Sequence, residues 1–80
     1  MTRETRETLA ASLSVGAFVA LARLKQGLTQ EQAAELLGWT VRTLGSTEQD
    51  ARRLTLRDAH ALSRVLGLDV RELAEMEAGA

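Results

Sequence analysis

The fold is decided by the stretch Gly27-Leu28-Thr29-Gln30-Glu31-Gln32-Ala33-Ala34-Glu35-Leu36-Leu37-Gly38, which contains the start, the apolar face and the end of one short helix. Thr29 and Gln32 have the spacing of a capping box, in which each side chain satisfies a free backbone N–H of the first helical turn. Gly38 follows the last apolar residue and readily adopts the left-handed conformation that ends a helix. The stretch therefore predicts a helix over Gln30–Leu37, followed by a tight turn.

A second short helix follows the turn directly, over Val41–Gln49. Two such helices can cross closely if the first has a small residue at the crossing, the turn tolerates positive φ and the second has an apolar anchor. Ala34, Gly38 and Leu44 occupy these three positions. The sequence predicts a helix-turn-helix unit from Thr29 to about Gln49.

Similar signals continue on both sides of this unit and predict an all-α chain. Helix-ending glycines, N-cap residues and apolar residues at helical spacing recur, and no stretch alternates as a strand would. The five predicted helices are Leu13–Gln26, Gln30–Leu37, Val41–Gln49, Leu56–Leu66 and Val70–Met76. We expect residues 13–76 to form the domain, 1–12 a flexible or partner-contacting N-terminal segment, and 77–80 a C-terminal tail.

Composition limits the chemistry that the chain can perform. The 80 residues include no cysteine and one histidine, so we expect no metal site and no cofactor. The chain also lacks a phosphate-binding glycine loop and paired inward-facing carboxylates, which argues against an enzyme. Its net charge is −1, but residues 40–64 hold five arginines against three acidic residues, and residues 65–80 hold four acidic residues against one arginine. This distribution is compatible with DNA binding without requiring it.

The uncharged stretch from Leu9 to Ala22 is too short to cross a bilayer as a helix. The residues before it carry balanced charges, whereas a signal peptide begins with a positive region. We therefore expect a buried first helix, a cytoplasmic protein and no membrane partner.

In their combined order and spacing, these motifs resemble the Cro/C1-type, or Xre-like, helix-turn-helix family of phage-repressor and antitoxin-type regulators. Residues 27–38 are very similar to the corresponding segment of that family, and the resemblance continues through Val41-Arg42-Thr43-Leu44, Glu48 and Leu66-Gly67-Leu68. It implies a five-helix, lambda-repressor-like domain that binds double-stranded DNA. The function implied is a sequence-specific transcriptional regulator, a repressor that binds operator DNA as a homodimer. The alternative is an antitoxin or anti-repressor module that binds a protein with the same scaffold.

The resemblance also assigns roles by position. Residues placed to contact base edges lie on the second helix of the motif: Val41, Arg42 and Ser46. Residues placed to contact phosphates lie at helix starts and just after the second helix: Thr29, Gln30, Thr43, Arg52 and Arg53. Arg23 and Glu48 occupy positions that form a structural ion pair between the first helix and the second helix of the motif.

Three residues of the second helix and its end depart from the family pattern. Asp50 replaces a glycine; aspartate tolerates the left-handed conformation but adds negative charge near DNA. Thr47 replaces an apolar anchor, and Gly45 costs about 1 kcal/mol relative to alanine inside a helix. These departures predict a looser, less basic reading helix.

The first helix has an apolar strip that the family pattern does not explain. Phe18, Leu21 and Leu24 follow one another at intervals of three residues. One interpretation is that the N-terminal segment folds back over the strip. The other is a surface for self-association or for a protein partner, and a homodimer would suit DNA with two symmetric half-sites.

Overall fold

The computed structural model describes residues 13–79, which form five α-helices. These are α2 (Val15–Lys25), α3 (Gln30–Leu37), α4 (Val41–Glu48), α5 (Leu56–Leu66) and α6 (Val70–Ala78). No strand occurs in this part of the chain, so the all-α prediction is confirmed. The expected N-terminal segment, residues 1–12, lies outside the described residues.

Helices α3 and α5 have the predicted bounds, and the other three differ at their ends. Helix α2 begins at Val15 rather than Leu13, because the Ser14 hydroxyl accepts a hydrogen bond from the Ala17 amide and caps the helix. Its last residue is Lys25, and α4 ends at Glu48, in each case one residue before the predicted end. Helix α6 continues two residues beyond Met76 to Ala78, within the expected tail.

Local hydrogen bonds set the start and end of α3 as the sequence predicted. The Thr29 hydroxyl accepts from the Gln32 amide at 3.1 Å, and the Gln32 side-chain oxygen accepts from the Thr29 amide at 2.9 Å. Gly38 has φ 75° and ends the helix in the left-handed conformation. The turn that follows therefore has a fixed geometry, which directs the chain into α4.

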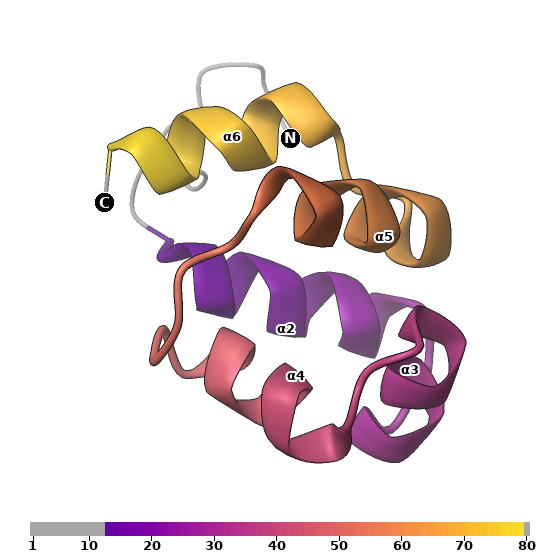
Figure 1. Cartoon of the computed structure of the whole chain (residues 1–80). Helices are drawn as coiled ribbons and strands as arrows, with labels where there is room; N and C mark the ends of the chain where they lie inside the picture. Colours follow the sequence, from indigo (N-terminus) through magenta and orange to yellow (C-terminus); the bar gives the residue numbers. More distant parts are fainter. Residues whose placement is uncertain (1–12, 80) are drawn as a thin grey trace.

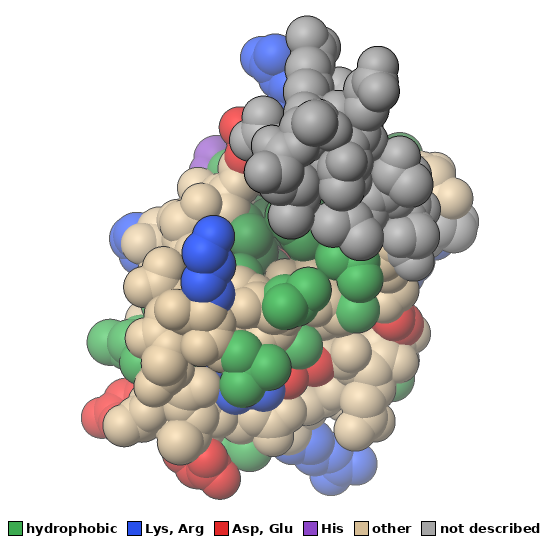
Figure 2. Space-filling view, turned by 180° about the vertical axis from the view of Figure 1, so that it is seen from behind, with side chains coloured by type: hydrophobic (Ala, Val, Ile, Leu, Met, Phe, Trp, Pro, Cys, Tyr) green, Lys and Arg blue, Asp and Glu red, His purple; other side chains and the backbone are tan. Residues whose placement is uncertain are grey.

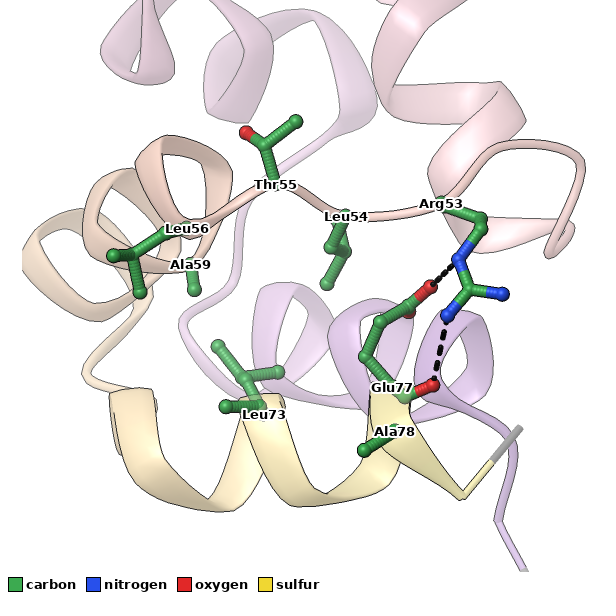
Figure 3. A pocket seen from close by; sticks show the side chains of 9 residues that line it. Arg53, Leu54, Thr55, Leu56, Ala59, Leu73, Glu77 and Ala78 are labelled. Carbon is green, nitrogen blue, oxygen red and sulfur yellow. Dashed lines mark hydrogen bonds and ion pairs between the residues drawn. The ribbon is translucent and has the colours of Figure 1, made fainter.

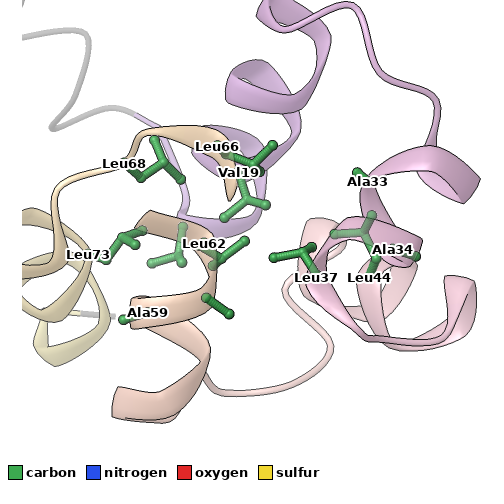
Figure 4. Close-up of a cluster of buried hydrophobic side chains, with 12 residues drawn as sticks. Val19, Ala33, Ala34, Leu37, Leu44, Ala59, Leu62, Leu66, Leu68 and Leu73 are labelled. Atoms are coloured by element: carbon green, nitrogen blue, oxygen red, sulfur yellow. The ribbon is translucent and has the colours of Figure 1, made fainter. Parts of the chain in front are cut away.

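The helices surround one apolar core, with α2 running through the middle of the domain (Figure 1). Helix α4 packs on one side of α2, next to α3, and α5 and α6 pack on the other side. The core residues Val19, Leu44, Leu62 and Leu73, from four different helices, are completely buried (Figure 4). Each such side chain contributes about 1.5–3 kcal/mol by leaving water. The core thus attaches α4 to the rest of the domain through its inner face.

The start of α2 and the end of α4 approach each other closely. A Cβ on Gly16 would lie 2.5 Å from the carbonyl oxygen of Glu48 and 2.6 Å from that of Thr47. Just after α4, Asp50 has φ 59°, and its Oδ1 accepts a hydrogen bond from the Gly16 amide at 2.8 Å. Asp50 thus adopts the left-handed conformation that aspartate tolerates, and its carboxylate caps the first turn of α2.

Candidate nucleic-acid interface

The turn between α3 and α4 holds the two helices of the motif in contact. The Trp39 amide donates to the Ala34 carbonyl oxygen at 2.9 Å, and the Thr40 hydroxyl accepts from the Thr43 amide at 3.1 Å to cap α4. Leu44 is completely buried and anchors α4 in the core. These contacts fix which side of α4 faces solvent.

The outer side of α4 carries the residues expected to contact bases. Val41 is 40% exposed, Arg42 is exposed and Ser46 is half-buried. Arg42 and Ser46 are four residues apart and therefore lie on one face of the helix. Among residues 13–79, no ion pair engages the Arg42 guanidinium. Within the described part of the chain, this face thus presents one positive charge that no ion pair neutralises.

Several residues expected to contact phosphates also have partners within the domain. The Thr29 hydroxyl caps α3, and the Thr43 hydroxyl oxygen accepts a hydrogen bond from Thr40 at 3.0 Å. Gln30, in the first turn of α3, donates from Nε2 to Glu48 Oε1 at 3.0 Å. The structure thus places Thr29 and Gln30 together at the start of α3, with Gln30 held against the end of α4.

Arg23 and Glu48 form an ion pair that ties α2 to α4. Arg23 Nε lies 2.7 Å from Glu48 Oε2, and Nη2 lies 3.1 Å from Oε1, so the pair is bidentate. The Arg23 side chain is 12% exposed and that of Glu48 7%. The hydrogen bond with Glu48 raises the pKa of Arg23 against the lowering effect of burial, so the guanidinium stays charged. Arg23 also donates to the Leu28 carbonyl oxygen at 2.9 Å, which fixes the loop before α3.

The two neighbouring arginines after α4 have different surroundings. Arg52 pairs with Asp58 of α5, with Nη2 2.8 Å from Oδ2, and donates from Nη1 to the Thr47 hydroxyl oxygen at 2.9 Å. Arg53 has a 76% exposed side chain and pairs with Glu77 at 3.2 Å (Figure 3). Arg52, with a 30% exposed side chain, is thus bound to partners within the domain, whereas Arg53 remains largely in solvent.

Thr47 is a structural residue that the sequence interpretation underestimated. It is only 2% exposed, and its hydroxyl donates to the Thr43 carbonyl oxygen at 2.9 Å while accepting from Arg52. The prediction of a weak anchor at Thr47 is therefore wrong, because hydrogen bonds replace the expected apolar contact. The sequence does place a threonine on the inward face of the helix, five residues before Arg52. This spacing alone does not show that the two side chains form a hydrogen bond.

The family model for a helix-turn-helix matches residues 19–73, more than half of the chain. This chain belongs to the Cro/C1-type helix-turn-helix family. Comparison with curated proteins and with solved structures gave no match. The matched region runs from the middle of α2 into α6 and so includes the whole motif. Membership identifies a DNA-binding protein of transcription regulation.

This helix-turn-helix protein also has an apolar groove away from the exposed face of α4. Leu21 and Leu24 of α2 are 52% and 62% exposed, and Phe18 is half-buried beside them. Together with residues of the α5–α6 connection they line a groove of about 760 Å³. Figure 2 shows hydrophobic side chains gathered on one face of the domain. In the described residues, no helix is long and apolar enough to cross a membrane.

Proposed function

We propose that the protein is a sequence-specific repressor that occupies operator DNA as a homodimer. One observation carries this proposal: the outer face of α4 presents Arg42 without an ion-pair partner among residues 13–79, while Leu44 and Thr47 hold the opposite face in the domain. A reading helix needs both properties, because bases are recognised only by side chains that are free to meet them from a fixed position.

The contacts follow from the chemistry of each side chain. The Arg42 fork fits the O6 and N7 acceptors of guanine, Val41 fits a thymine methyl group, and the Ser46 hydroxyl suits several base edges. We assign the phosphate contacts to Thr29, Gln30, Thr43 and Arg53, with backbone amides at the start of α3 as further donors. With a net charge of −1, affinity depends on where these groups lie rather than on overall attraction.

A homodimer compensates for the limited chemistry of one reading helix. Each α4 carries a single arginine, so one copy reads few base pairs. We assign the dimer contact to Phe18, Leu21 and Leu24, because this groove is apolar and lies outside the reading face. A two-fold pair of domains would place two reading helices on symmetric half-sites about one helical turn apart.

Selection of bound duplexes from random DNA tests the reading function. We expect an inverted repeat, binding that weakens steeply with salt, and a loss of preference at defined base pairs in Arg42→Ala. Arg71→Ala is the matched control, because Arg71 is an exposed arginine on α6. Equal affinity for selected and random duplexes, or a flat response to salt, would contradict the proposal.

Sedimentation of the free protein tests the dimer. We expect Leu21→Glu to produce a monomer, since burying a carboxylate in an apolar contact is costly even where Lys25 of the same groove can pair with it. Leu36→Glu is the control, because Leu36 is 58% exposed on α3 and does not line the groove. A wild-type protein that stays monomeric at high concentration and on DNA would refute the dimer but not DNA reading.

A further inference from the structure

The geometry points to Arg52 as a positioning residue that fixes the orientation of the reading helix α4, rather than as a phosphate contact. This inference rests on the proposed function, because the face that Arg52 would orient is the one proposed to meet the bases. It concerns the free protein, however, and part of it can be tested without DNA.

Arg52 connects both ends of the reading helix with α5. Its Nη1 donates to the hydroxyl oxygen of Thr47, in the last turn of α4, at 2.9 Å. Its Nη2 lies 2.8 Å from Oδ2 of Asp58, in the first turn of α5. The guanidinium carbon lies 5.4 Å from the centre of the Trp39 ring, in the turn that precedes α4. One planar cation thus contacts the residues before and at the end of α4 and joins them to α5.

The partners of Arg52 are themselves held in place. Thr47 is 2% exposed and donates its hydroxyl proton to the Thr43 carbonyl oxygen, so its oxygen is left to accept from Arg52. Asp58 is 8% exposed, and the same Oδ2 accepts from the Thr55 amide at 2.9 Å in the capping box of α5. A rigid guanidinium with two arms on fixed partners and a face on an aromatic ring has little rotational freedom.

A phosphate contact would require Arg52 to give up this arrangement. Asp58 would then remain buried without its counter-charge, which is strongly unfavourable. Arg53 faces no such conflict, because its side chain is 76% exposed and its pair with Glu77 is screened by solvent. The two adjacent arginines therefore have different roles: Arg53 contacts a DNA phosphate, and Arg52 fixes the orientation of α4.

Binding measurements separate positioning from phosphate contact. We compare Arg52→Lys and Arg52→Met with Arg53→Ala on a selected duplex and on a scrambled duplex over a range of salt concentrations. Lysine keeps the charge but loses the fork and the stacked plane. We expect the affinity ratio of the two duplexes to fall about tenfold in both Arg52 variants, as when one base contact is lost, with the salt slope unchanged. In Arg53→Ala we expect both affinities to fall and the slope to drop by about 0.9.

The opposite pattern would overturn the proposal. If Arg52 neutralises a phosphate, Arg52→Met lowers both affinities equally and reduces the salt slope by about 0.9, while Arg52→Lys keeps the specificity of the wild type. Asp58→Asn is a second way to distinguish positioning from phosphate contact. The amide oxygen can still accept the hydrogen bond from the Thr55 amide, but the counter-charge of Arg52 is gone. If Arg52 is a positioning residue, Asp58→Asn loses as much specificity as Arg52→Lys. The double variant then loses no more specificity than either single variant. Tighter binding to both duplexes in Asp58→Asn would show that the freed Arg52 meets phosphate.

Trp39, the only tryptophan of the chain, provides a measurement that needs no DNA. We expect acrylamide to quench its fluorescence more strongly in Arg52→Met and Asp58→Asn than in the wild type, and the amides of α4 to exchange faster. Arg53→Ala should leave both unchanged. If the wild type selects no site, the proposed function fails while these two signals still report on Arg52. Unchanged quenching and exchange in folded Arg52→Met would refute the positioning role.

Discussion

Replacing either of two helical glycines by alanine should change stability in opposite directions. In Gly16→Ala, the new Cβ would lie 2.5 Å from the Glu48 carbonyl oxygen and 2.6 Å from that of Thr47, both backbone atoms at the end of α4. Flexible side chains cannot relieve this contact, so α2 and α4 must move apart. In Gly45→Ala, no atom lies within 4 Å of the new Cβ.

The magnitudes follow from these contacts. Overpacking costs about 1–3 kcal/mol, and separating the helices weakens the 2.8 Å hydrogen bond from the Gly16 amide to Asp50, worth about 1 kcal/mol. The helix preference of alanine returns about 1 kcal/mol. We therefore expect Gly16→Ala to lose about 1–3 kcal/mol of unfolding free energy. In Gly45→Ala only the helix preference acts, and we expect a gain of about 1 kcal/mol.

Thermal and urea unfolding followed by circular dichroism measure both effects. A change of 1 kcal/mol shifts the Tm of a small domain by about 4–8 °C, so the Tm values of the two variants should differ by at least about 8 °C. A Tm of Gly16→Ala at or above that of the wild type would refute the close approach of α2 to α4. Gly45 shares a helix face with Arg42, so the more stable Gly45→Ala should bind the selected duplex more weakly if that face meets bases.

Three further predictions concern two ion pairs and Asp50. Arg23→Met should lose about 3 kcal/mol in urea unfolding, because the Glu48 carboxylate stays buried without its counter-charge; the double variant with Glu48→Met should recover part of it. Asp50→Ala should lose about 2 kcal/mol of unfolding free energy, since alanine disfavours the left-handed conformation and cannot accept the hydrogen bond from the Gly16 amide of α2. A similar loss in Asp50→Asn would contradict this account. Glu77→Gln should change stability by less than about 1 kcal/mol but tighten DNA binding at low salt by releasing Arg53, and an effect that persists at high salt would count against an electrostatic cause.

The sequence by itself determined where the helices of the motif begin and end. Thr29 and Gln32 cap α3 through bonds between residues three positions apart, and Gly38 ends it by its own backbone preference. Such signals are local, so they act in the same way whatever the rest of the chain does. The order of the motifs was also enough to indicate the family, which the match to residues 19–73 shows. The ends of α2, α4 and α6 were displaced by one or two residues, where local signals are weaker.

The tertiary structure decided the roles of residues whose partners are distant or buried. Arg52 and Arg53 are adjacent residues of the same type, and the sequence does not distinguish them. In the structure Arg52 lies between Asp58 and Trp39, whereas Arg53 extends into solvent. The sequence alone indicates that Thr47 is a weak anchor. In the structure its hydroxyl donates to the Thr43 carbonyl oxygen and accepts from Arg52. The helix-turn-helix stretch that specifies the fold thus determines where its reading helix begins and ends. The orientation of that helix also depends on the loop after α4 and on α5, because a helix is oriented by all the surfaces that it packs against.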